Sequence, residues 1–319
     1  MAERNAETTQ NTGVTTELLL ETFGRFLRME VAHGNATDDT IQSYEREVKL
    51  WIQWCRDMKV EPGLAQRDDL VSYRDYLKSR NVAFATRKMK MSVLRRFYDS
   101  AVFNKLLAVN PAASIRSGTN PTMPEDRVQS LTKDALATLF HDIPVDTITG
   151  QRDRAIVGLM AVHGLRRIEI HRLNQSDVQM DGTTAFLDVW GKSNRRRRVY
   201  LRPDTHASIV AYQNSKLAAG LPVDALFLAH DNRARGQRIS RRGINMIVDR
   251  YLEINSLKRA GLSCQALRHT HGILAIAGGA RVEHLRDSMG HNDLETTAIY
   301  VKVISRKKNN PANFIDVEL

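Results

Sequence analysis

The stretch Gln265-Ala-Leu-Arg-His-Thr-His-Gly-Ile-Leu-Ala-Ile-Ala277, followed by Gly278-Gly279, sets the expected fold of the last third of the chain. Leu267–Ala277 is predicted to form an apolar helix, and the two glycines end it. A further helix is expected over Val282–Met289, with Gly290 and His291 directly after it. Tyr300 lies nine residues beyond His291.

Upstream of this stretch, the sequence predicts more helices and one small sheet. Helices are expected over Lys133–Phe140 with Thr132 as N-cap, over Arg154–Val162 up to Gly164, and from Ser240 to about Ile254. The runs Thr184–Trp190 and Arg197–Leu201 alternate as strands do and flank Gly191-Lys192-Ser193-Asn194, which predicts a hairpin. Residues 130–304 therefore read as a mostly helical domain with a small sheet.

The N-terminal part of the chain has apolar residues at helical spacing and predicts a separate all-α domain over 16–113. We expect four or five helices there, including one over Thr86–Val102. Residues 1–15 are polar and predicted to be a disordered tail. Residues 114–129 contain Gly118, Pro121 and Pro124 without apolar periodicity and are assigned to a linker. Residues 305–319 form a polar C-terminal tail.

The charge of the chain favours a polyanionic partner. Lysine and arginine number 47 against 36 acidic residues, which gives a net charge of +11 and a pI near 9.8. Such an excess suits nucleic acid, although a basic solvated surface explains it equally well. Cys55 and Cys264 are far apart, which argues against a disulfide framework or a zinc site. Neither a signal peptide nor a membrane-spanning run is recognisable, so a cytoplasmic protein is expected.

Several residues of the second domain match the chemistry of phosphodiester cleavage. That reaction needs a nucleophile, charge on the non-bridging oxygens and a proton for the leaving oxygen. A tyrosine can hold the phosphate as an ester, and arginines can brace its oxygens bidentately. Each residue also has a plainer explanation: Tyr300 as a core residue, Arg166 as ion-pair partner of Glu169, His291 as a helix C-cap and Lys192 as a solvated turn residue.

The order and spacing of these residues resemble the tyrosine recombinases, the family of phage integrases and Xer-type enzymes, over roughly residues 16–304. The resemblance implies a core-binding, SAM-like helical domain and an α+β catalytic domain that together form a C-shaped clamp on DNA. It implies Tyr300 as nucleophile, Arg166 and Arg268 as the catalytic arginines, Lys192 as the acid for the leaving 5′ oxygen and His291 as a phosphate ligand. Glu169 and His269 would support them.

One position departs from the family pattern. The family usually has a histidine three residues before the second arginine, where this chain has Gln265. A glutamine can donate a hydrogen bond to phosphate but cannot take up a proton near neutral pH. Three interpretations stay open: a tolerated variant in which water or Lys192 carries more of the proton transfer, a slower or regulated enzyme, and lost catalysis.

Basic clusters elsewhere are predicted to contact DNA, because phosphate contacts supply affinity and position. The helix over Thr86–Val102 and the helix after Ser240 are the candidates for the major groove. The residues assigned to DNA contact are Arg87, Lys88, Lys90, Arg95, Arg195, Arg196, Arg197, Arg198, Arg238, Arg241 and Arg242.

The resemblance implies a site-specific recombinase that acts without a metal or other cofactor. Its partners would be duplex DNA with inverted-repeat core sites and three further copies of the chain, as a tetramer on a Holliday junction. The tail 305–319, with Phe314 and Ile315, would dock on a neighbouring copy. Two alternatives remain: a type IB topoisomerase-like enzyme, and a catalytically silent, sequence-specific DNA-binding regulator. A bacterial cytoplasm is expected, with a plasmid or phage as source.

Overall fold

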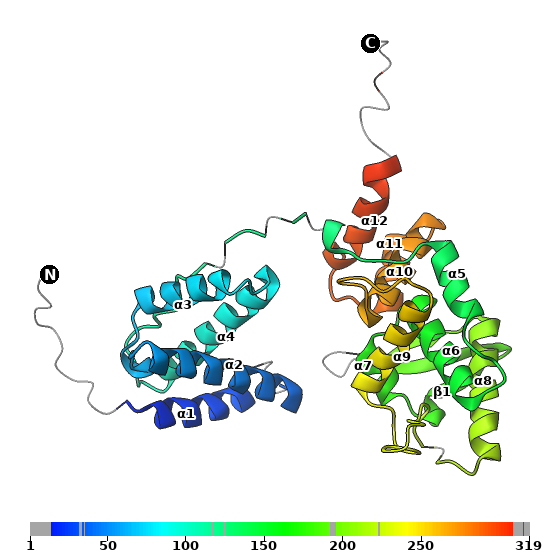
Figure 1. Cartoon of the computed structure of the whole chain (residues 1–319), viewed down its shortest axis with the longest axis horizontal. Coiled ribbons are helices and arrows are strands. Elements are labelled where there is room, and N and C mark those ends of the chain that lie inside the picture. Colours follow the sequence, from blue (N-terminus) through cyan, green and yellow to red (C-terminus); the bar gives the residue numbers. More distant parts are fainter. Residues whose placement is uncertain are drawn as a thin grey trace, which may run out of the picture. The chain divides into compact units, whose positions relative to one another are not determined.

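The computed structural model describes residues 14–31, 34, 36–116, 118–120, 122–123, 125–191, 196–222, 224–308 and 315. The chain divides into two compact units, Met1–Pro121 and Thr122–Leu319 (Figure 1). The boundary falls within the segment 114–129 that the sequence assigns to a linker. The predicted fold class, a helical domain followed by a mainly helical domain with a small sheet, is confirmed.

The first unit is helical throughout its described residues. Its elements are α1 (Thr16–Met29), α2 (Asp38–Asp57), the 3-10 turn η1 (Pro62–Leu64), α3 (Arg67–Ser79) and α4 (Phe84–Phe103). Side chains of Thr15 and Thr37 cap α1 and α2, as expected for β-hydroxyl residues at an N-cap. The core centres on Trp51, whose indole donates to Tyr98 Oη at 3.1 Å, and Tyr98 donates to the Pro62 carbonyl at 3.0 Å. This buried relay ties α2, α4 and η1 together.

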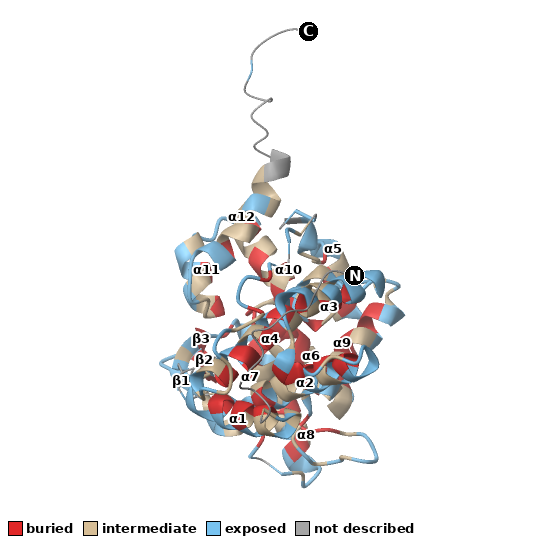
Figure 2. Ribbon diagram, turned by 90° about the vertical axis from the view of Figure 1, so that its left-hand side faces the viewer, coloured by how far each residue is buried: buried red, intermediate tan, exposed pale blue. Residues whose placement is uncertain are grey.

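Helix α6 (Ile148–Ala161) lies in the core of the second unit, and ten of its fourteen residues are buried (Figure 2). Helix α6 packs against α8 (Pro203–Ala218) and α10 (Cys264–Ala277). The other elements are η2 (Glu125–Arg127), α5 (Lys133–His141), α7 (Arg167–Arg172), η3 (Gln175–Asp177), α9 (Arg241–Ile254), α11 (Val282–Met289) and α12 (Glu295–Lys308).

The predicted helices are present, but three of them start earlier than predicted, among them α4, which starts at Phe84 rather than Thr86. Thr132 and Ser240 cap α5 and α9 as expected, and α11 has the predicted bounds. Helix α6 starts six residues before the predicted Arg154, because Thr147 accepts from the Gly150 amide and caps it there. Helix α10 starts at Cys264 rather than Leu267. Helices α8 and α12 were not anticipated from the sequence.

A three-stranded antiparallel sheet, β1 (Val178–Asp181), β2 (Thr184–Trp190) and β3 (Arg196–Tyr200), lies beside the helices. The predicted hairpin is confirmed, since Leu187 pairs with Val199 and Trp190 with Arg196. Strand β1 was missed because only Val178 and Met180 are apolar there. The hairpin turn 192–195 lies outside the described residues. Within the described part of the chain, no helix has the length and apolar character needed to cross a membrane.

Candidate active site

Arg166 stands at the entrance to α7, where Gly164 turns the chain with a positive φ of 67°. Its Nη1 donates to Glu169 Oε1 at 2.9 Å, and its Nη2 donates to the Gly290 carbonyl at 3.1 Å. The side chain is 31% exposed. Arg166 is therefore the helix-start ion-pair partner of Glu169 and, at the same time, a partly open guanidinium that a phosphate can reach.

Arg268 enters the same region from α10 and is 1% exposed. It donates to the Gly164 carbonyl and, through Nη2, to the Met289 carbonyl at 2.7 Å. Burial, with the charge of Arg166 nearby, lowers the pKa of Arg268 to about 10, so the side chain stays cationic at neutral pH. The two arginines thus bring two positive charges to the end of α11.

Glu169 is the buried anion between these cations. Its carboxylate accepts from the Arg166 amide at 2.8 Å and from both Nη atoms of Arg197 at 2.9 Å. Burial would raise its pKa, but the hydrogen bonds and charge of Arg197 and the Arg166 amide bring the pKa below its ordinary value. Glu169 is therefore ionised at neutral pH.

His291 follows Gly290, which ends α11 in the left-handed conformation with φ 64°. The C-cap is thus Gly290, not His291. The His291 Nδ1 lies 2.8 Å from Oγ1 of Thr297. Burial and the charges of Arg268 and Arg166 lower the His291 pKa to about 4, which makes the imidazole neutral at pH 7.

Tyr300 lies on α12 and is 2% exposed. Its ring packs on α10 at Gly272, where a Cβ atom would come within 2.5 Å of the ring. Its hydroxyl lies 3.1 Å from His269 Nδ1. Burial raises the Tyr300 pKa against the opposing charges of Arg268 and Arg166. Tyr300 is therefore both a core residue and within the electrostatic reach of the two arginines.

Four of the predicted catalytic residues meet in this region, Arg166, Arg268, His291 and Tyr300, together with Glu169, which was predicted to support them. Gln265 lies in the first turn of α10 with an exposed side chain, and the residue at the Tyr300 hydroxyl is His269 instead. Lys192 lies outside the described residues. Its role as the acid for the leaving oxygen stays a prediction.

Two residues at the site were not anticipated in these positions, Thr297 and Arg197. Thr297 is buried one turn before Tyr300 on the same helix. Arg197 was grouped with the DNA contacts, yet its side chain is only 14% exposed. The sequence does contain a feature that indicates the burial of Arg197. Side chains alternate along a strand, so Arg197 shares a face of β3 with the buried Val199, while Arg196 and Arg198 point the other way.

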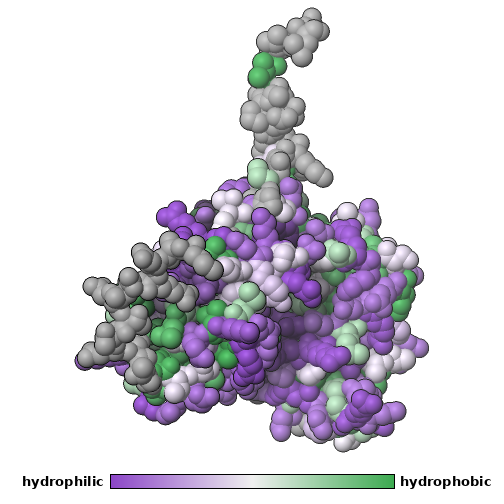
Figure 3. All heavy atoms as spheres, turned by 60° about the vertical axis from the view of Figure 1, so that its left-hand side comes forward, coloured by the Kyte–Doolittle hydropathy of each residue, from purple (hydrophilic) through white to green (hydrophobic). Residues whose placement is uncertain are grey.

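The remaining predicted DNA contacts differ in how far their side chains are exposed. Lys88, Arg196, Arg198 and Arg242 are exposed. Hydrophilic residues cover most of the face that Figure 3 shows. Lys90 instead pairs with the buried Glu47, and Arg238 donates to the carbonyls of His171 and Leu173, at 3.0 and 2.8 Å. Arg87, Arg95 and Arg241 are partly buried. Arg195 lies outside the described residues.

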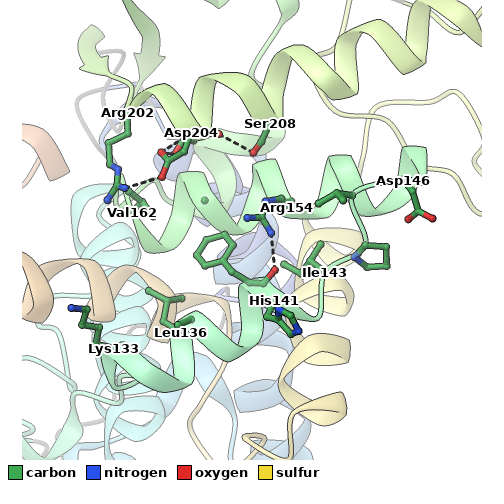
Figure 4. Close-up of a pocket in the computed structure, with 16 residues that line it drawn as sticks. Lys133, Leu136, His141, Ile143, Asp146, Arg154, Val162, Arg202, Asp204 and Ser208 are labelled. Atoms are coloured by element: carbon green, nitrogen blue, oxygen red, sulfur yellow. Dashed lines mark hydrogen bonds and ion pairs between the residues drawn. The ribbon is translucent and has the colours of Figure 1, made fainter.

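A cavity of about 820 Å³ lies apart from this site, bordered by α5, α6 and α8 (Figure 4). Leu136 and Phe140 contribute apolar surface, and Arg154 donates to the Phe140 carbonyl at 2.7 Å. None of the predicted catalytic residues lines it.

Comparison with known proteins identifies the two units. Residues 129–306 match the model described as the phage integrase family, and residues 21–105 match the phage integrase N-terminal SAM-like domain. Tyrosine recombinase XerC of Roseiflexus sp. (strain RS-1) is 27% identical over 289 residues, which cover 87% of this chain and 88% of the relative. Tyrosine recombinase XerD of Oceanobacillus iheyensis is 26% identical over 294 residues, covering 90% and 94%.

Solved structures share the fold. A XerH site-specific recombinase bound to palindromic difH substrate, in a post-cleavage complex, aligns with a TM-score of 0.69 at 16% identity and covers 96% of this chain and 97% of that one. A lambda integrase tetramer bound to a Holliday junction gives a TM-score of 0.70 at 16% identity, covering 91% and 78%. The fold is that of the tyrosine recombinases. The chain belongs to the phage integrase family.

Proposed function

We propose that the protein is a site-specific recombinase that cleaves and rejoins duplex DNA through a phosphotyrosyl ester at Tyr300. The observation that carries the proposal is the convergence of Arg166, Arg268 and His291 beside a tyrosine. Relatives named tyrosine recombinases cover about nine-tenths of the chain and support it.

The arginines would stabilise the transition state. A pentacoordinate phosphate carries its charge on the non-bridging oxygens, and guanidinium groups can donate two parallel hydrogen bonds to them. Arg166 is partly exposed and Arg268 is held by two carbonyls, so little reorganisation is needed when phosphate arrives. Neutral His291 would donate a third hydrogen bond through Nε2. These groups supply the charge stabilisation that metal-dependent enzymes obtain from a metal ion, and we propose a metal-independent reaction.

The reaction balances in one displacement. The Tyr300 oxygen bonds to phosphorus, the bond from phosphorus to the 5′ oxygen breaks, and a 3′-phosphotyrosyl ester and a 5′ hydroxyl result. The phenol proton would pass to Nδ1 of His269, the group 3.1 Å away, and Lys192 would protonate the 5′ oxygen. His269 would thus perform the proton transfer that Gln265 cannot.

Tyr300 must leave its buried position before it attacks. Its ring is packed on Gly272, so α12 must shift to expose the oxygen, and the proposed proton transfer requires that this shift keeps the hydroxyl within hydrogen-bond reach of His269. We infer that DNA binding favours this shift. Rejoining would reverse the displacement with a different 5′ hydroxyl, through a Holliday junction inside a tetramer, with the tail 305–319 docking on a neighbouring copy.

The decisive experiment traps the covalent ester. Purified protein is incubated in EDTA with nicked suicide duplexes from its own locus, and the products are separated in SDS. We expect a protein–DNA adduct in the wild type that is absent from Tyr300→Phe. Sequence-specific binding without an adduct in the wild type would instead identify a silent DNA-binding regulator. Relaxation of supercoiled plasmid that lacks any recognised site would identify a topoisomerase-like enzyme.

A further inference from the structure

We infer that Arg197 is a positioning residue of the active site, which fixes Arg166 and the segment before His291, rather than a contact to the DNA backbone. The inference rests on the proposed function for its catalytic consequence. Its structural part, the placement of Arg166, can be tested without any DNA.

All three nitrogens of the Arg197 guanidinium bind groups of the protein. Its two Nη atoms each donate to a different oxygen of Glu169 at 2.9 Å, and its Nε donates to the Ser288 carbonyl at 3.0 Å. A bidentate pair of this kind fixes both partners in one plane. The side chain is only 14% exposed and points into the protein, away from the direction a solvent-facing phosphate contact would need.

The C-terminal end of α11 is held by arginine side chains. Its last carbonyls lack partners within the helix and carry partial negative charge. Three consecutive ones are each held by a different arginine: Ser288 by Arg197, Met289 by Arg268 and Gly290 by Arg166, at 3.0, 2.7 and 3.1 Å. Because His291 follows directly, this arrangement fixes where its imidazole can lie.

The Arg197 side chain packs closely against Gly290. A Cβ atom there would lie 3.1–3.2 Å from the Arg197 side chain, so the guanidinium rests directly against the turn. The left-handed φ of 64° and this approach both favour glycine. Strand β3 and the end of α11 are thus joined through one side chain.

Arg197 also balances the negative charge of Glu169. Glu169 is buried, and its cationic partners are Arg197 and Arg166. While Arg197 neutralises the carboxylate, Arg166 keeps Nη2 on Gly290 and its remaining N–H groups for phosphate. Without Arg197, Arg166 becomes the only guanidinium paired with Glu169 and is drawn toward it. Loss of Arg197 should therefore lower the rate of cleavage more than it lowers the affinity for DNA.

The test compares two variants. Arg197→Met keeps the length of the side chain and removes its charge, and Arg197→Lys keeps the charge but cannot form the bidentate pair with Glu169. Arg172→Met is the matched control, because Arg172 is exposed on α7 and outside the site. The probe is the duplex that the wild type selects from a randomised pool. Binding is measured across a salt series, and the single-turnover rate of adduct formation is measured at saturating protein.

We expect Arg197→Met to lower the cleavage rate by roughly 100-fold, the scale of a misplaced catalytic group, with Kd changed less than about threefold and an unaltered salt slope. Arg197→Lys should lose at least about tenfold in rate and remain folded by circular dichroism. A salt slope that falls by about one, with an unchanged saturated rate, would mean a phosphate contact and overturn the inference.

A second readout keeps the two hypotheses apart. In spectra of the free protein labelled with 15N-arginine, the Arg166 Nε–H signal should shift in Arg197→Met and stay in place in Arg172→Met. If the wild type forms no adduct, the proposed function fails, and this signal alone decides the inference. An Arg166 signal that does not move in Arg197→Met would overturn the positioning role.

Discussion

The hydroxyl of Thr297 lies 2.8 Å from Nδ1 of His291 and joins the helix that carries Tyr300 to the residue that follows α11. A neutral imidazole carries its proton on one nitrogen only. When the threonine donates to Nδ1, the proton of His291 must reside on Nε2. That tautomer is the one that can donate to a phosphate oxygen.

Replacing this hydroxyl with a methyl group should therefore remove the preference of His291 for the Nε2–H tautomer without changing the shape of residue 297. Thr297→Val is isosteric, whereas Thr297→Ser keeps the hydroxyl. We expect Thr297→Val to cleave about tenfold more slowly, in keeping with the loss of one oriented donor, and Thr297→Ser to remain within about threefold. Long-range 1H–15N spectra of His291 should report the Nε2–H form in the wild type and a mixture in Thr297→Val. A pure Nε2–H form in both would contradict the assignment.

If the phenol proton of Tyr300 passes to His269, substitutions at two neighbouring positions of α10 should slow cleavage to different extents. His269→Phe removes the group at the Tyr300 hydroxyl and should slow cleavage by about 100-fold or more, within the range of a lost general base. Gln265→Ala should have a smaller effect, because its side chain is exposed. The measurement is single-turnover adduct formation at pH 7 and pH 9. If Gln265→Ala proves the more damaging of the two, the route through His269 is wrong.

Gly272 should tolerate no side chain. A Cβ atom there would come within 2.5 Å of the Tyr300 ring, so Gly272→Ala forces the ring or α12 to move. We expect a loss of about 1–3 kcal/mol in the free energy of unfolding, typical of an overpacked core. Gly24→Ala serves as control for the change of residue type, because Gly24 is also helical and a Cβ atom there would meet only the ends of the Arg28 and Glu45 side chains, at 3.6 and 3.9 Å. Urea unfolding of the three proteins checks this, and equal losses in both variants would mean that Tyr300 is not packed as described.

The buried histidines predict acid sensitivity of the second unit. Burial lowers the pKa of His163 and of His271 to about 4, below the value near 6.5 of an unfolded chain. Between these values the unfolded state binds more protons, so the free energy of unfolding falls as the pH drops from about 6.5 to about 4. Above about pH 7 these groups should add no pH dependence.

A variant isolates one of these histidines. His163→Asn keeps a donor for the Tyr200 carbonyl and removes the titration. Its free energy of unfolding should fall by up to about 1 kcal/mol less per pH unit between pH 6 and pH 5 than that of the wild type. Urea titrations at pH 5, 6 and 7 provide the comparison. Parallel curves for the two proteins would mean that His163 does not titrate in this window.

The sequence by itself determined the capped helices, the β2–β3 hairpin and the chemical inventory, whereas α8, α12 and β1 were not anticipated. Caps at Thr132 and Ser240, and the hairpin around β2 and β3, depend on neighbours within a few residues, so they can be predicted from the chain alone. The order of Arg166, Arg268, His291 and Tyr300 likewise pointed to the family before any coordinates.

The tertiary structure alone decided which of these side chains touch. Nothing local indicates that His269 rather than Gln265 reaches Tyr300, since this depends on how α12 packs on α10 across Gly272. In the run of arginines that enters β3, the alternation with Val199 places Arg197 on the inner face, but only the structure shows that its guanidinium pairs with Glu169 there. Contacts between residues far apart in sequence follow from the packing of whole elements, which local spacing does not encode.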